Sequence, residues 1–186
     1  MTIAVSNTGP LIALAKIQAL DLLLALYRKV YVPPSVYQEA VIEGMAQKAP
    51  DALLIQEAFT SPIFEIHPLE KKVVYPALFE KIHVAEQESI LLAIQLKADV
   101  LLIDDWNARL IAEDTFHAQR LKTEIKGTLG VITTAFIQQI LQAEEAIQLL
   151  ERIKLRRDIW IHPRLCDQVI QAIRRASHEA SAGSAR

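Results

Sequence analysis

The sequence predicts an α/β protein with a parallel sheet, because strand-like and helix-like segments alternate along most of the chain. Short β-type runs occur at 3–6, 30–32, 63–66 and 99–104, with helical patterns between them. The run at 99–104 has four apolar residues between two aspartates, as in a strand buried on both faces. Right-handed crossovers through the intervening helices would join such strands in parallel.

Prolines mark the helix starts in the first half of the chain. Pro10 suits the first turn of a helix after the first strand, and Pro33–Pro34 stop the second strand and open the next helix. This second helix is expected to end near Glu43, where the composition becomes loop-like until Pro50. A weaker helical pattern covers 51–59.

The second half is expected to be mostly helical. Residues 84–97 are apolar on nearly every side, which is typical of a buried helix, and a more polar helix begins at 106. A short strand is expected at 121–125. Three further helical patterns follow, at 128–142, 144–156 and 163–177.

The composition fits one domain with a helical addition. The chain has 186 residues, and its hydrophobic fraction of 52% supplies a sizeable core and excludes disorder for most of it. We expect a sheet domain at 1–135, a helical extension packed on it at 136–177, and a flexible tail at 178–186. The net charge of −2 gives no overall basic field for nucleic acid, so any such contact would be local.

The sequence indicates a reduced, cytoplasmic setting. Cys166 is the single cysteine, so it has no disulfide partner within the chain and is expected to be a small buried residue. The N-terminal segment is apolar but lacks a positive leader, and Asn7, Pro10 and Lys16 interrupt it, unlike a secretory signal. No charge-free window reaches the length of a membrane span, so no membrane contact is expected.

Acidic or amide residues follow strands or lie on apolar helices at four separate places. They are Asn7, Glu39, Glu88 and the pair Asp104–Asp105. Because parallel strands end at one edge of a sheet, Asn7 and the aspartate pair can meet there. Glu39 and Glu88 lie on the apolar sides of their helices, where an unpaired carboxylate is unfavourable. A hard divalent cation offsets the cost of burying a carboxylate and the repulsion between carboxylates. The cation expected is Mg²⁺, with Mn²⁺ as a substitute.

Each of these residues also has a purely structural explanation. Asn7 can end the first strand and cap the next helix, and either aspartate of the pair can cap the helix that begins at 106. Glu39 can be a solvated helix residue. Glu86 and Glu88 can be favourable acids in a first helical turn.

Four segments keep a recognisable order and spacing over roughly residues 2–135. They are VSNTGPLIALAKIQALDLL, VYVPPSVYQEAV, AEQESILLAIQLKADVLLIDDWNAR and KGTLGVI, and RDIWIHPRLCDQVIQAI follows near the end. Together they resemble the PIN-like fold, in a bacterial and archaeal branch related to VapC-type toxins. The resemblance implies a three-layer α/β/α domain and a metal-dependent ribonuclease with an acidic pocket. It also implies a homodimer and a small antitoxin protein as partner.

The resemblance assigns the acidic pocket residue by residue. Glu86 competes for the third acidic position and Asp104 for the fourth. Asp105 is preferred to Asp104 because it lies two residues beyond Ile103, where the family often has a hydroxyl side chain. Asn7, Glu88 and Asp105 are the expected metal ligands, and Asp104 is included among the catalytic residues. The four positions are held in order by Asn7, Glu39, Glu88 and Asp105.

Asn7 departs from the acidic pattern of the family. Its amide oxygen can ligate Mg²⁺ but is neutral, so the metal affinity should fall. Two hypotheses follow: an Mg²⁺-dependent endoribonuclease that is a toxin, or a degenerate module that binds RNA or a small protein without cleavage.

Basic residues give weaker indications of RNA contact. Arg109 and Lys126 are candidates for phosphate contacts. The segment ERIKLRRDIW places four cations beside Trp160, and such a segment can bind RNA through charge and stacking. A solvated helix face is the commoner explanation of that pattern.

Overall fold

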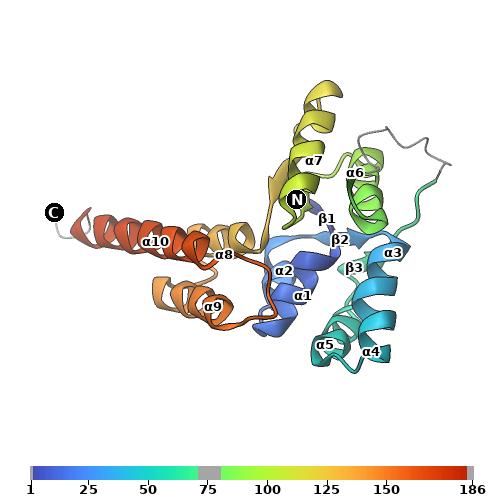
Figure 1. Cartoon of the computed structure of the whole chain (residues 1–186). Helices are drawn as coiled ribbons and strands as arrows, with labels where there is room; N and C mark the ends of the chain where they lie inside the picture. Colours follow the sequence, from blue (N-terminus) through green and yellow to red (C-terminus); the bar gives the residue numbers. More distant parts are fainter. Residues whose placement is uncertain (1, 71–80, 184–186) are drawn as a thin grey trace. The chain divides into compact units, whose positions relative to one another are not determined.

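The computed structural model describes residues 2–70 and 81–183. Within them, five parallel strands form one sheet in the order β3-β2-β1-β4-β5 (Figure 1). This confirms the expected α/β class, although the last strand begins three residues later than predicted. The strands are β1 (Ile3–Ser6), β2 (Lys29–Val32), β3 (Phe64–Ile66), β4 (Val100–Leu102) and β5 (Glu124–Lys126).

The strand register brings the ends of β1, β4 and β5 together. Ser6 is opposite Leu102, and Leu102 is opposite Lys126. One residue further on, the backbone N–H of Asn7 donates to Leu102 O at 2.9 Å and that of Ile103 donates to Lys126 O at 2.8 Å. The chain therefore leaves the three strands side by side at the carboxyl edge of the sheet.

One face of the sheet is covered by the helices of the first two crossovers. The crossovers β1–β2 and β2–β3 run in the same direction across the sheet, so right-handed connections place their helices on the same face. The packing of α1 against α5 agrees with this placement. The helices are α1 (Thr8–Lys16), α2 (Asp21–Leu26), α3 (Pro34–Tyr37), the π-helix η1 (Gln38–Glu43), α4 (Gly44–Ala46) and α5 (Pro50–Ala58).

The opposite face is covered by α6 (Val84–Leu96) and α7 (Trp106–Ala118). The β4–β5 crossover runs in the other direction from β1–β2, and α6 contacts β1, β4 and α7. Figure 1 shows α6 and α7 on one side of the strands and α1 to α5 on the other, which gives three layers. The core between sheet and helices includes Val5, Ile90, Leu92, Leu101, Ile103, Ala108 and Phe116.

The loop predicted at 44–50 and the end of the helix predicted at 128–142 both differ in the structure. The loop expected at 44–50 is shorter, because Gly44–Ala46 continues the helical run. A Cβ at Gly44 would lie 2.8 Å from the Cβ of Ala52, so this glycine permits close packing of α4 and α5 rather than a turn. The helix expected at 128–142 is α8 (Thr128–Ile137), and the positive φ of 59° at Gln139 explains its earlier end.

The chain divides into two compact units, 1–128 and 129–186. In the second unit α9 (Ala143–Leu155) packs against α10 (Pro163–Gly183), which ends later than the expected residue 177. Their buried side chains are Ala146, Leu150 and Ile153 on α9, and Cys166, Ile170 and Ile173 on α10. Cys166 is thus buried as predicted, whereas the boundary at residue 135 and the packing of the extension on the sheet domain stay predictions.

None of the helices in the described part of the chain is long and apolar enough to cross a membrane.

Candidate functional site

The end of β1 places Asn7 and Thr8 at a topological switch point. The crossover after β1 leads toward β2 and the crossover after β4 leads toward β5, so a crevice is expected between the ends of β1 and β4. Asn7 is only 5% exposed, and its Oδ1 accepts a hydrogen bond from Thr8 N at 2.7 Å. Asn7 therefore caps α1, which was one of its two predicted roles, and Oδ1 keeps a second lone pair.

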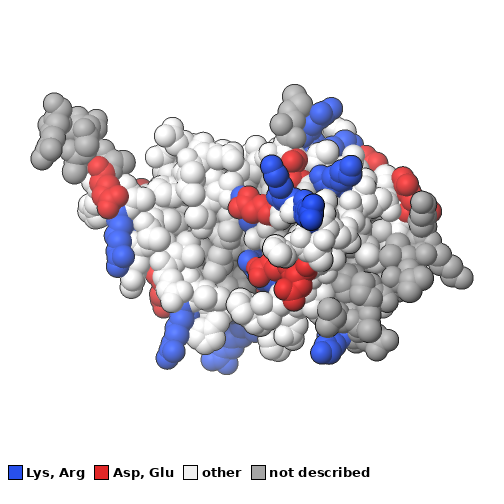
Figure 2. Space-filling view, turned by 90° about the horizontal axis from the view of Figure 1, so that it is seen from above, with Lys and Arg blue, Asp and Glu red and all other residues white. Residues whose placement is uncertain are grey.

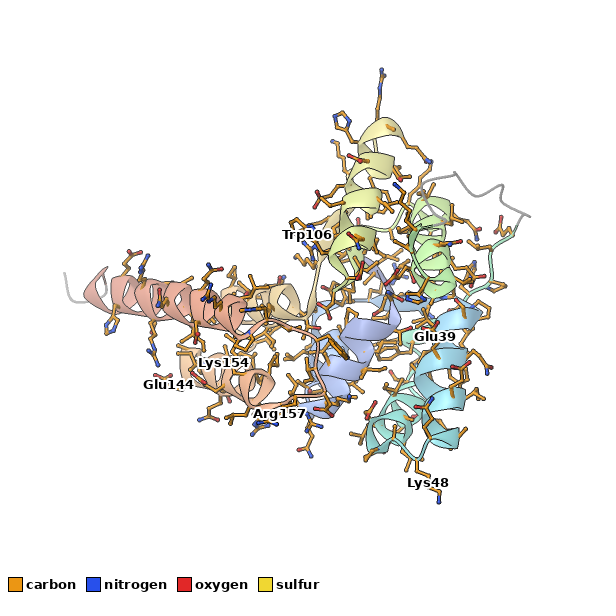
Figure 3. All side chains as sticks on the ribbon, in the orientation of Figure 1. Glu39, Lys48, Trp106, Glu144, Lys154 and Arg157 are labelled. Carbon is orange, nitrogen blue, oxygen red and sulfur yellow. The ribbon has the colours of Figure 1, made fainter. Side chains whose placement is uncertain are left out.

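Glu39 lies on the π-helix η1 and is tied to the end of β1. Thr8 Oγ1 donates to Glu39 Oε2 at 2.7 Å, although the two residues are 31 positions apart. Glu39 is half-buried, and Figure 3 shows it near the start of the helical run, below α6. π-Helical turns are rare in proteins as a whole, and many of those that occur lie at functional sites. The hydrogen bond fixes the position of the Glu39 carboxylate, so Glu39 is not simply a solvated helix residue. Thr8 belongs to the site although the sequence did not indicate it.

Glu86 is the most deeply buried carboxylate that the structure brings toward Glu39. It is 8% exposed in the first turn of α6, and its Oε2 accepts from His83 N at 3.0 Å. Burial raises the pKa of Glu86, the bond from His83 lowers it, and the negative charges of Asp105 and Glu39 raise it further. Glu86 therefore lies within electrostatic reach of both Asp105 and Glu39.

Glu88, the predicted third acid, is half-buried two residues further along α6. Residues two positions apart on a helix do not face each other, so Glu86 and Glu88 point in different directions. The structure places the competing Glu86 beside the charges of Asp105 and Glu39. The assignment of Glu88 stays a prediction, and Glu86 becomes its stronger rival.

The two aspartates after β4 have separate roles. Asp105 is exposed and caps α7, because its Oδ1 accepts from Ala108 N at 2.8 Å. Asp104 instead holds the start of α8: Oδ1 accepts from Thr128 N at 2.7 Å and Oδ2 accepts from Thr128 Oγ1 at 2.6 Å. Burial raises the pKa of Asp104, whereas the bonds from Thr128 and the charge of Arg109 lower it.

Glycines allow the backbone to approach Asp104 closely. A Cβ at Gly127 would lie 2.5 Å from Asp104 Oδ1, which no side chain permits without movement. At Gly9 a Cβ would lie 3.5 Å from Asp104 Cβ, an ordinary contact. Gly9 and Gly127 thus place the start of α1 and the end of β5 against the same aspartate.

The two residues predicted to contact RNA, Arg109 and Lys126, both bind other groups of the sheet domain. The guanidinium of Arg109 donates from Nη1 to Ile103 O at 3.2 Å and from Nη2 to Ile125 O at 3.5 Å. Lys126 forms an ion pair with Glu124 at 3.0 Å. Arg109 therefore links β4 to β5, and the RNA-binding roles of Arg109 and Lys126 stay predictions.

The comparison with protein families identifies this arrangement. A family profile for the PIN domain matches residues 3–175. The chain belongs to the PIN domain family. The match confirms the resemblance inferred from the sequence at the level of the family, and PIN domains are a nuclease-type family that generally uses divalent metal ions. No curated protein and no solved structure matched the chain.

The oxygen donors of this PIN domain suit a divalent metal in kind. The carboxylate of Glu86 interacts with those of Asp105 and Glu39, and its raised pKa reflects burial and negative charge that a cation would offset. Asp104 is already bound to Thr128, and one lone pair of Asn7 Oδ1 is used by Thr8. As the side chains stand, the described residues contain no group of three or more His, Cys, Asp and Glu arranged to hold a metal. Metal binding would therefore require side-chain adjustment at this edge.

Proposed function

We propose that this PIN domain protein is a metal-dependent endoribonuclease and the toxin component of a toxin–antitoxin system. The observation that carries the proposal is the approach of Glu39, Glu86 and Asp105 at the carboxyl edge of a parallel sheet. In an open α/β sheet this edge is where ligands bind. RNA as substrate, a small antitoxin as partner, a homodimer and a cytoplasmic setting belong to the same proposal.

In this proposal each residue of the edge has a distinct task. Glu39, Glu86 and Asp105 hold Mg²⁺ or Mn²⁺, with Glu88 as the alternative third acid. Thr8 orients the Glu39 carboxylate through its 2.7 Å hydrogen bond. Asp104 fixes the start of α8 against the sheet. A bound divalent ion supplies the Lewis-acid charge that phosphodiester hydrolysis needs.

A second candidate function is a PIN module that binds RNA or a small protein without cleaving RNA. The neutral Asn7 favours it, because an amide supplies no charge where the family pattern has an acid. The described residues also lack a ready-made group of three acids, which is consistent with weak metal binding. Both candidates use the same edge, so they differ only in whether hydrolysis occurs.

Cleavage of structured RNA in the presence of Mg²⁺ or Mn²⁺ tests the leading proposal. We expect cleavage that EDTA abolishes and that falls by about 100-fold or more in Glu39→Gln, Glu86→Gln and Asp105→Asn. Glu88→Gln is the matched control, because it removes a charge from the same helix, and we expect less than a 5-fold change in rate. Equal losses in Glu88→Gln and none in Glu86→Gln would restore Glu88 as the third acid. RNA that is bound but not cut by any form would favour the binding module.

A further inference from the structure

The connection between α9 and α10 exposes side chains that the fold does not use. Trp160 is 99% exposed and Leu155 is 82% exposed, although a tryptophan ordinarily buries most of its large surface. The neighbouring Ile159 is buried, and the guanidinium of Arg156 donates to Asp158 at 2.9 and 2.8 Å. Trp160 is therefore exposed on a segment that is held by the buried Ile159 and by the ion pair of Arg156 with Asp158.

The surrounding segment is strongly basic. Residues 152–175 contain seven Lys and Arg but only two Asp. Lys154 is paired with Asp167 at 2.6 Å and with Glu151 at 3.0 Å, so its charge is compensated. Four other cations are exposed and have no ion pair with any residue that the structure describes: Arg157, Arg164, Arg174 and Arg175.

Part of this charge lies along one face of α10. Arg164, Gln168, Gln171 and Arg175 are three or four residues apart and all exposed, so they form a continuous polar stripe. Arg164 and Arg175 are separated by about 16 Å along the helix. The helix α10 packs against α9, and its side chains Cys166, Ile170 and Ile173 are buried. The polar stripe is thus free to contact a ligand.

We propose that Trp160, Arg157 and Arg164 form a binding surface for single-stranded RNA in the second unit. A base stacks on the exposed indole, and the two unpaired guanidinium groups contact the phosphates on either side. The exposed guanidinium groups of Arg157 and Arg164 favour this ligand, because phosphates supply the negative charge that they lack among the described residues. Figure 2 shows acidic and basic side chains intermixed on the face it displays.

The surface goes beyond the proposed cleavage, and its test requires no metal. The chain has two tryptophans, Trp106 and Trp160, so Trp106→Phe leaves Trp160 as the only indole fluorophore. A 12-nucleotide oligouridine is titrated into this variant of the full chain in EDTA. We expect quenching of Trp160 fluorescence and an affinity that falls with increasing salt.

Variants of the surface then decide the assignment. In the full chain, with fluorescein-labelled oligouridine, we expect Trp160→Ala to weaken binding about 10-fold or more and Trp160→Phe to retain most of it. Arg157→Ala and Arg164→Ala should each weaken binding and reduce the slope of log affinity against log salt by about 0.7. Lys48→Ala, an exposed cation of the first unit labelled in Figure 3, is the control and should leave affinity and slope unchanged.

Several outcomes would overturn the proposal. Binding that is equally strong in Trp160→Ala and in the double variant of Arg157 and Arg164 would place the RNA elsewhere. Preference for an acidic peptide over oligouridine, or a loss of dimers in Trp160→Ala without a change in RNA affinity, would assign the surface to a protein partner. Because binding is measured without metal, loss of cleavage at the acidic edge leaves this result intact, and the converse also holds.

Discussion

At the scale of single residues, the acidic edge combines helix capping with charge repulsion. Asn7 caps α1, Asp105 caps α7 and Asp104 binds Thr128 at the start of α8. An ionised carboxylate offers about four acceptor sites, so a cap uses only part of its capacity. Asp105 can therefore cap its helix and still ligate a cation. The repulsion falls on Glu86, which is buried with two negative neighbours.

Glu86→Gln should raise the melting temperature at pH 7 in the absence of metal. The pKa of Glu86 is raised in the folded protein, first by burial and then by the charge of Asp105, so the folded state binds the proton more tightly than the unfolded state. Stability is therefore lost as pH rises from the unfolded pKa through the folded pKa. Gln keeps an oxygen that can accept from His83 N and removes the charge, and circular dichroism melts in EDTA from pH 4 to pH 8 measure the effect.

The gain in Glu86→Gln should vanish toward pH 4, where the wild-type carboxyl is protonated in both states. Glu88→Gln serves as the comparison on the same helix and should give a smaller gain. A lower melting temperature for Glu86→Gln at pH 7 would show that the ionised carboxylate is compensated, contrary to the interactions described above.

The thiol of Cys166 should be unreactive in the native protein. The side chain is fully buried, and burial raises its pKa to about 11, so little thiolate exists at pH 8. Reaction with a thiol reagent such as DTNB should be at least about 100-fold slower in buffer than in guanidinium chloride. Equal rates in the two solutions would mean that the α9–α10 pair opens readily.

At the scale of elements, the sequence predicted what depends on local pattern and missed what depends on tertiary contact. The apolar run before Asp104 and the all-round apolar helix 84–97 predicted β4 and α6 correctly. Gly44 was read as loop because its close neighbour, Ala52, belongs to the next helix. The hydrogen bonds Thr8–Glu39 and Asp104–Thr128 span 31 and 24 positions, so no local pattern indicates them.

The acidic pocket was predictable only where local sequence pattern indicates its residues. Strand ends and apolar helix faces indicated Asn7, Glu39 and the aspartate pair. The choice between Glu86 and Glu88 depends on the rotation of α6 about its axis, which residue spacing does not fix when the helix is apolar on nearly every side. In the structure the side chain of Glu86 accepts a hydrogen bond from His83 N at the start of α6.

Gly127→Ala should destabilise the protein by about 1–3 kcal/mol, as expected for overpacking. The added Cβ would lie 2.5 Å from Asp104 Oδ1 and 3.3 Å from Arg109 Nη1, so the hydrogen bonds from Thr128 to Asp104 would shift. Urea unfolding measures the loss. Gly9→Ala is a matched control beside the same aspartate, because its Cβ would make only ordinary contacts, the nearest at 3.5 Å. A loss in Gly9→Ala equal to that in Gly127→Ala would rule out this steric explanation.

At the scale of the whole molecule, the small net charge is the sum of a negative first unit and a positive second unit. Residues 1–128 contain 12 Lys and Arg against 16 Asp and Glu, whereas 129–186 contain 8 against 6. The first unit therefore carries −4 and the second +2. A negative unit with a cluster of carboxylates favours cations, and a positive unit with an exposed tryptophan favours phosphates. The proposed metal binding and the proposed RNA binding would thus rest on opposite charges in different parts of the chain.

Asn7→Asp should make the stability of the whole protein more dependent on metal. The new carboxylate can keep the hydrogen bond from Thr8 N, but its charge is added near Glu39 at a residue that is 5% exposed, so the melting temperature in EDTA should fall. Saturating Mn²⁺ should raise it by more than in the wild type, since a ligand at 100 times its Kd stabilises by about 2.7 kcal/mol. Calorimetric melts with EDTA or Mn²⁺ measure both shifts in melting temperature. The control is Gln56→Glu, which adds the same charge at an exposed position of α5 and should show neither shift. If Mn²⁺ shifts Asn7→Asp no more than the wild type, the first position of the pocket is not a metal ligand, and the neutral Asn7 no longer favours the non-cleaving module.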